Sequence, residues 1–141
     1  MVRHQWHYLR ISINPFASQQ SLHNRVFMMK IGFTSQNFKT ITGHAGKTRR
    51  FLVYEVTEDG SVTELDRIDL PKEMAMHNYR GDEHPIFELD LLLTGGCGAG
   101  FINRLAQYDV RVMATGETSP AETIEKLLKG EPILAPQPHE H

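Results

Sequence analysis

A strand, a glycine loop and a helix are encoded one after another in Leu91-Leu92-Leu93-Thr94-Gly95-Gly96-Cys97-Gly98-Ala99-Gly100-Phe101. Short apolar runs of this kind form strands that are buried on both faces of α/β sheets. The glycines permit a tight turn, and the first amides of the following helix point back at the loop. Cys97 is the single cysteine of the chain, and this position is typical of a ligand or a reactive thiol.

Hydrophobic spacing predicts the remaining strands. Alternation and β-branched or aromatic residues predict five strands, over residues 29–34, 50–56, 62–70, 89–94 and 109–114. An Asp-Gly pair predicts a hairpin between the second and third strands, and the imperfect alternation of the third predicts a bulge.

Two helices are expected after the fourth and fifth strands. The first covers residues 98–108, and the second lies between a Ser119 cap and Gly130. The long connection over 71–88 has no regular pattern. This order predicts an α/β fold with a five-stranded mixed sheet, in which the first three strands are antiparallel and the last two are parallel.

The length and composition of the chain indicate one domain of ordinary size. The chain has 141 residues, 40% of them hydrophobic and 23% charged, which suffices for a packed core. Residues 1–27 lack acids and periodicity, so we expect a poorly ordered extension produced by a misassigned start. Residues 28–132 form the predicted domain, and residues 133–141 form a tail.

The cysteine count and the hydropathy indicate the cellular setting. One cysteine excludes an intramolecular disulfide and fits a reducing compartment. No apolar run approaches the ~20 residues that a membrane helix needs. We therefore expect a cytoplasmic protein without a membrane partner.

Charge is distributed unevenly along the chain. Residues 1–54 carry a net charge of +8, and residues 55–141 carry −10. A basic half without acids is typical of a protein that binds nucleic acid or a smaller anion. Only Lys47, Arg49 and Arg50 are clustered, whereas nucleic-acid binders usually show a continuous basic surface. We expect no nucleic-acid partner, and we assign these three residues to an anion or an anionic cofactor.

Two glycine motifs resemble nucleotide-binding loops but lack required residues. A Gly-Lys-Thr triplet needs a glycine five residues earlier, where Ile41 stands. The dinucleotide pattern would need a third glycine where Phe101 stands. What remains is a loop and helix N-terminus that favour an anion, with Gly95, Gly96 and Gly98 as candidate contacts.

Three side chains are candidate metal ligands: Cys97, His44 and His84. A thiol near a helix N-terminus tends toward a lowered pKa, and the thiolate binds soft metals. His44 follows the first strand, so we expect it near Cys97 if the first and fourth strands are neighbours. His84 precedes Pro85 in the long connection, where His77 is a further soft-metal candidate.

The ligand set is too small for a familiar metal site within one chain. The sequence has no Cys-x-x-Cys or paired-histidine motif, and one cysteine cannot form a four-cysteine iron–sulfur site. A metal would arrive as a preassembled cluster or be shared within a homodimer. Two alternatives stay open: a small-anion-binding regulatory module with a structural cysteine, and a thiol enzyme with His44 or His84 as base.

From Met28 to Pro132 the chain resembles the NifX/NifB-type dinitrogenase iron–molybdenum cofactor-binding family. The matching segments are the opening strand, the loops at 42–47 and 93–98, and the Thr-Gly-Glu-Thr-Ser-Pro segment before the last helix. The resemblance implies a ribonuclease H-like three-layer fold without ribonuclease activity.

The resemblance also implies a carrier or assembly role without catalysis. Such a protein binds an iron–sulfur or iron–molybdenum cluster transiently and passes it to other assembly proteins or an acceptor apo-protein. The family histidine corresponds to His44, and the family glycine loop to Gly95–Gly98. Cys97 departs from the family pattern, because many members have an aliphatic residue there.

Overall fold

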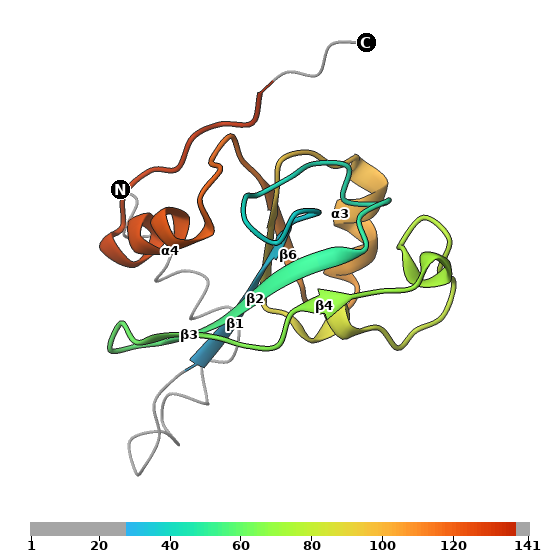
Figure 1. The fold of residues 1–141 in the computed structure, drawn as a ribbon, viewed down its shortest axis with the longest axis horizontal. Coiled ribbons are helices and arrows are strands. Elements are labelled where there is room, and N and C mark those ends of the chain that lie inside the picture. Colours follow the sequence, from blue (N-terminus) through green and yellow to red (C-terminus); the bar gives the residue numbers. More distant parts are fainter. Residues whose placement is uncertain (1–27, 138–141) are drawn as a thin grey trace.

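The computed structural model describes residues 28–137, which are built around one mixed β-sheet (Figure 1). The strands are β1 (Met28–Thr34), β2 (Arg50–Thr57), β3 (Val62–Glu64), β4 (Ile68–Asp69), β5 (Leu91–Thr94) and β6 (Arg111–Ala114). They lie in the order β3-β2-β1-β5-β6, and β4 also pairs with β2. β2 is antiparallel to β1, whereas β5 is parallel to both β1 and β6. The predicted mixed α/β sheet is therefore confirmed.

The predicted number of five strands is wrong, because the segment 62–70 forms two strands. β3 pairs with the end of β2, from Tyr54 to Val56, and β4 pairs with its beginning, at Arg50 and Phe51. Between them the Arg67 side chain turns back to donate to Glu64 at 3.1 Å. The irregularity expected as a bulge is thus a break that makes the sheet six-stranded.

Two helices follow the parallel strands: α3 (Ala99–Ala106) and α4 (Pro120–Lys129). The N-cap of α4 is the predicted one, since Ser119 Oγ accepts a hydrogen bond from Glu122 N at 3.2 Å. Gly130 ends the helix with a φ of 74°, a conformation that glycine adopts without strain. No helix within residues 28–137 has the length and apolarity to span a membrane.

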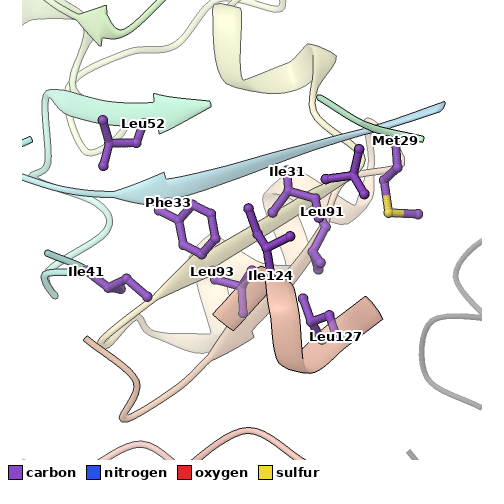
Figure 2. Close-up of a cluster of buried hydrophobic side chains, with 10 residues drawn as sticks. Met29, Ile31, Phe33, Ile41, Leu52, Leu91, Leu93, Ile124 and Leu127 are labelled. Atoms are coloured by element: carbon purple, nitrogen blue, oxygen red, sulfur yellow. The ribbon is translucent and has the colours of Figure 1, made fainter. Parts of the chain in front are cut away.

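The sheet is covered by one helix on each face, which gives three layers (Figure 1). Figure 2 shows the first core cluster, in which Ile124 and Leu127 of α4 pack on Ile31, Phe33 and Leu93 of the sheet. The second cluster lies on the opposite face and contains Leu105 of α3 with Leu92 of β5. Alternate residues of each strand thus face different helices, as the pleat of a strand requires.

The connection from β4 to β5 contains two short 3₁₀ helices, η1 (Lys72–Met74) and η2 (Pro85–Glu88). It is longer than most connections in compact domains, and such segments commonly carry function. Ala75 and Met76 are buried, at 1% and 2% exposure, which fixes the middle of this connection to the second core cluster.

A buried carboxylate holds the C-terminal segment against α4. Glu117 accepts hydrogen bonds from Lys126 Nζ at 2.7 Å and from Leu134 N at 2.8 Å. Burial alone would raise the pKa of Glu117, but these two donors outweigh it and hold the pKa below its ordinary value. The ionised form is therefore favoured in the folded state.

We predict that Glu117→Gln destabilises the protein at pH 7 by roughly 1–3 kcal/mol, because the buried Glu117 side chain loses its negative charge and with it the charge-assisted hydrogen bond from Lys126. The folded-state pKa is lowered, so this stabilisation is complete above the unfolded-state pKa of about 4.3. It is lost as the pH falls through the folded-state value. Urea unfolding at pH 7 and under acid conditions should show a smaller acid loss in Glu117→Gln than in wild type. The exposed Glu125→Gln on the same helix serves as control, and equal acid sensitivity of all three proteins would contradict this account.

Candidate functional site

The two glycine loops that follow β1 and β5 pack backbone against backbone. Because these strands are parallel neighbours, their loops leave the sheet at the same edge. Gly95 N donates to Thr42 O at 2.9 Å, and Ala45 N donates to Gly96 O at 3.1 Å. We call this set of interactions, between residues 42–45 and 95–96, the loop–loop contact. It confirms the expected proximity of the two loops.

Glycine fits without displacement where the loops meet. A Cβ on Gly95 would lie 3.3 Å from Gly43 N and from the Thr42 carbonyl. These are backbone atoms, so they cannot move aside as the end of a flexible side chain can. A side chain at position 95 would therefore require the facing backbone of residues 42 and 43 to move by a few tenths of an ångström.

Two buried threonines fix the loop–loop contact to the strands. Thr34 and Thr94 are the last residues of β1 and β5, both are fully buried, and their hydroxyls lie 2.8 Å apart. Thr34 Oγ1 donates to Thr42 O, and Thr94 Oγ1 accepts from Gly96 N at 3.3 Å. The hydroxyls thus satisfy loop backbone groups that the sheet does not reach.

A pocket of about 370 Å³ opens beside the loop–loop contact. It is lined by His44, Ala45, Gly46, Lys47, His77, Gly96, Cys97 and Gly98. Six residues that the sequence singled out as candidates are therefore brought together here: His44, Lys47, His77, Gly96, Cys97 and Gly98. A neighbouring pocket of about 310 Å³ shares His44 and Lys47.

His44 lies at the junction of the two pockets in a left-handed conformation, with a φ of 54°. Its carbonyl accepts hydrogen bonds from Lys47 N at 2.9 Å and Thr48 N at 3.0 Å, which closes the turn. Histidine is among the residues that tolerate this conformation, and such residues cluster at functional loops. His44 is solvent-exposed.

Cys97 is half-buried and packs against the second core cluster. Burial raises the pKa of the Cys97 thiol above its usual value. The expectation of a lowered pKa from the nearby helix is therefore wrong, because the apolar surroundings disfavour the thiolate. A protonated thiol also argues against the thiol-enzyme alternative.

The pocket is electropositive. Lys47 lines both pockets, and none of the described residues that line either one is acidic. Gly98 is the N-cap of α3, whose first turn as described contains no acidic side chain. The first amides of a helix have no partner within it and favour an anion. The pocket therefore suits a negatively charged ligand that a thiolate or an imidazole can coordinate.

The structure places His84 outside this pocket. His84 is 5% exposed and caps η2. Its Nε2 donates to Met74 O at 2.8 Å, and its Nδ1 accepts from Ile86 N at 3.2 Å. Burial lowers the pKa of His84. With both ring nitrogens committed to the backbone, His84 has a structural role, and its ring offers no lone pair to a metal.

The two arginines also lie away from the pocket. The Arg50 guanidinium donates to Gln36 O at 3.2 Å, lies 3.5 Å from Asp69 and covers the Phe38 ring. Arg49 donates its backbone N–H to the Gln36 side chain at 3.1 Å, and it lines neither pocket described above. Of the three basic residues assigned to an anion from the sequence, only Lys47 lines the pocket.

His77 is a pocket residue that the sequence indicated only weakly. It reaches the pocket through a contact with Gly46, which is 31 positions away in the sequence, and no local pattern encodes such a contact. Among residues 28–137, no three His, Cys, Asp or Glu side chains converge closely enough to hold a single metal ion.

These features define a small α/β module with a cationic pocket at one sheet edge, lined by histidines and a thiol. The family model described as dinitrogenase iron-molybdenum cofactor matches residues 28–130, and the chain belongs to this family. No curated protein matches the sequence.

Two solved structures share the fold. The crystal structure of PH0822 is 16% identical with a TM-score of 0.57, and the match covers 74% of this chain and 94% of that one. The NMR structure of TM1290 from Thermotoga, provisionally named a NifB protein of the DUF35 family, is 15% identical with a TM-score of 0.51. That match covers 80% of this chain and 99% of the Thermotoga protein.

We predict that Gly95→Ala lowers the free energy of unfolding by about 1–3 kcal/mol, because its Cβ overpacks the loop–loop contact. Gly100→Ala is the matched control, since a Cβ there meets nothing within 4 Å and alanine favours a helix. Urea unfolding of both variants measures the difference. Equal stability of the two variants would show that the contact does not constrain the loops.

We predict that Cys97 reacts slowly with iodoacetamide at neutral pH, because the raised pKa leaves little thiolate. The pH of half-maximal reactivity should lie higher in the folded protein than in the same chain unfolded in urea. Alkylation followed by mass spectrometry across a pH series provides the measurement. A folded-state midpoint below the unfolded one would contradict the burial argument.

Proposed function

We propose that this protein is a carrier or assembly protein for a metallocluster and not an enzyme. It binds an iron–sulfur or iron–molybdenum cluster, or a precursor, and passes it to other assembly proteins or to an acceptor apo-protein. The observation that carries this proposal is the pocket that gathers Cys97, His44 and Lys47 in a chain of the dinitrogenase iron-molybdenum cofactor family.

The chemistry of the pocket supports a cluster as cargo. The Cys97 thiolate is a soft ligand and the His44 imidazole a borderline one, and both suit iron in a cluster. Lys47 and the amides that begin α3 balance the negative charge of the cluster. The glycines at 96 and 98 let a bulky ligand approach the backbone.

The same pocket supports transient rather than permanent binding. Cluster binding must displace the proton from Cys97, whose pKa is raised by burial, and this proton release weakens the net affinity. Two protein ligands leave most positions of a cluster open to a partner. Both properties favour release to an acceptor.

We also propose a fold assignment, a cellular location and an oligomeric state. The sheet order and the helix on each face support a ribonuclease H-like assignment for a cofactor-binding domain of residues 28–132. We propose a cytoplasmic location, because a lone thiol stays reduced there. A homodimer would supply further ligands to one cluster.

The test is anaerobic reconstitution with ferrous iron and sulfide. Wild type should acquire the visible chromophore of an iron–sulfur cluster, and both Cys97→Ala and His44→Ala should weaken its binding at least about tenfold. Arg49→Ala, which changes an exposed residue that lines neither pocket, is the control. Unchanged binding in both ligand variants would refute the ligand assignment.

The second candidate is a small-anion-binding regulatory module. It is favoured by the neighbouring pocket, where Lys47 lies beside the hydroxyl-bearing Thr42 and Thr48. This candidate predicts thermal stabilisation by phosphate or molybdate that is equal in wild type and Cys97→Ala. It also predicts that no chromophore forms during reconstitution.

A further inference from the structure

His77 enters the pocket from the connection between η1 and η2. Its backbone N–H donates to Gly46 O at 2.8 Å, and its ring Nδ1 lies 3.0 Å from the same carbonyl. Two interactions therefore tie this residue to the loop that carries His44. The side chain is solvent-exposed and lines the pocket together with Cys97.

The contact with Gly46 fixes the tautomer of the His77 ring. A carbonyl oxygen can only accept, so Nδ1 must carry the hydrogen, and the lone pair of the neutral ring lies on Nε2. A metal-binding histidine has the same arrangement, in which one ring nitrogen donates to a carbonyl and the other binds the metal. In His84, by contrast, both ring nitrogens bind the backbone.

Hydrogen bonds from α3 hold the segment that carries His77 in place. Arg104 of α3 donates from Nη1 to Met76 O at 2.8 Å and from Nη2 to Tyr79 O at 2.6 Å. Met76 is also buried, at 2% exposure. Since α3 directly follows the Cys97 loop, one arginine couples the position of His77 to the helix beside that loop. A side chain on such a preorganised segment loses little conformational entropy when it binds.

We propose that His77 is a third protein ligand to the bound cluster, through Nε2, and that Arg104 is a positioning residue for it. This inference rests on the proposed function. The ligands then come from three separate segments: the loop after β1, the connection between η1 and η2, and the loop after β5. A cluster that fills this pocket of about 370 Å³ then contacts all three segments. Two of its metal atoms each bind one imidazole nitrogen.

The first test uses the protein without any metal. Long-range ¹H–¹⁵N spectra of the neutral histidines should show His77 as the Nδ1–H tautomer and His84 as the Nε2–H tautomer. His77→Ala and His84→Gln assign the two signals. An Nε2–H tautomer at His77 would overturn the inference whether or not the protein binds a cluster.

The second test uses a cluster built from ferrous iron and sulfide, then reduced to a paramagnetic state. Pulsed EPR of protein labelled with ¹⁵N-histidine should show two imidazole couplings in wild type. His77→Ala should remove one and lower cluster affinity about tenfold, whereas His44→Ala should remove the other. Arg104→Met should weaken the His77 coupling and preserve that of His44. Glu73→Gln, an exposed change in η1, should keep both.

The outcomes separate this inference from the proposed function. A wild-type protein that acquires no cluster refutes both. A cluster that forms in wild type, with couplings and affinity unchanged in His77→Ala, overturns the role of His77 and leaves the proposed function standing.

Discussion

The pocket is built on the backbone contact between the loops that follow β1 and β5. Two hydrogen bonds, Gly95 N to Thr42 O and Ala45 N to Gly96 O, join loops that are distant in sequence. A Cβ at position 95 would press on backbone atoms of Thr42 and Gly43 that lie only 3.3 Å away. This close approach places the imidazole of His44 and the thiol of Cys97 around one pocket.

The two hydrophobic cores create the conditions for that contact. Alternate residues of the sheet pack under α4 on one face and under α3 on the other, so β1 and β5 are held as parallel neighbours. The buried hydroxyls of Thr34 and Thr94 then join the strand ends to the loops by hydrogen bonds. Apolar burial supplies the stability, whereas these few polar contacts determine the shape of the pocket.

The sequence predicts those parts of the molecule that local chemistry determines. The cap at Ser119, the glycine cap at Gly130 and the succession of strands and helices along the chain are all encoded in short segments. The proximity of the loops that carry His44 and Cys97 follows once β1 and β5 are neighbours in the sheet. Three features depend on long-range contacts and are missed: the break between β3 and β4, the raised pKa of Cys97, and the place of His77. For His84 the local pattern misleads, because its ring is used by its own turn.

We propose that a cluster binds beside the loop–loop contact. Anomalous scattering at the iron edge, from anaerobic crystals of the protein loaded with an iron–sulfur cluster, would locate the bound iron. We expect an anomalous peak in the pocket lined by His44, His77 and Cys97. Iron located only elsewhere on the molecule would contradict it.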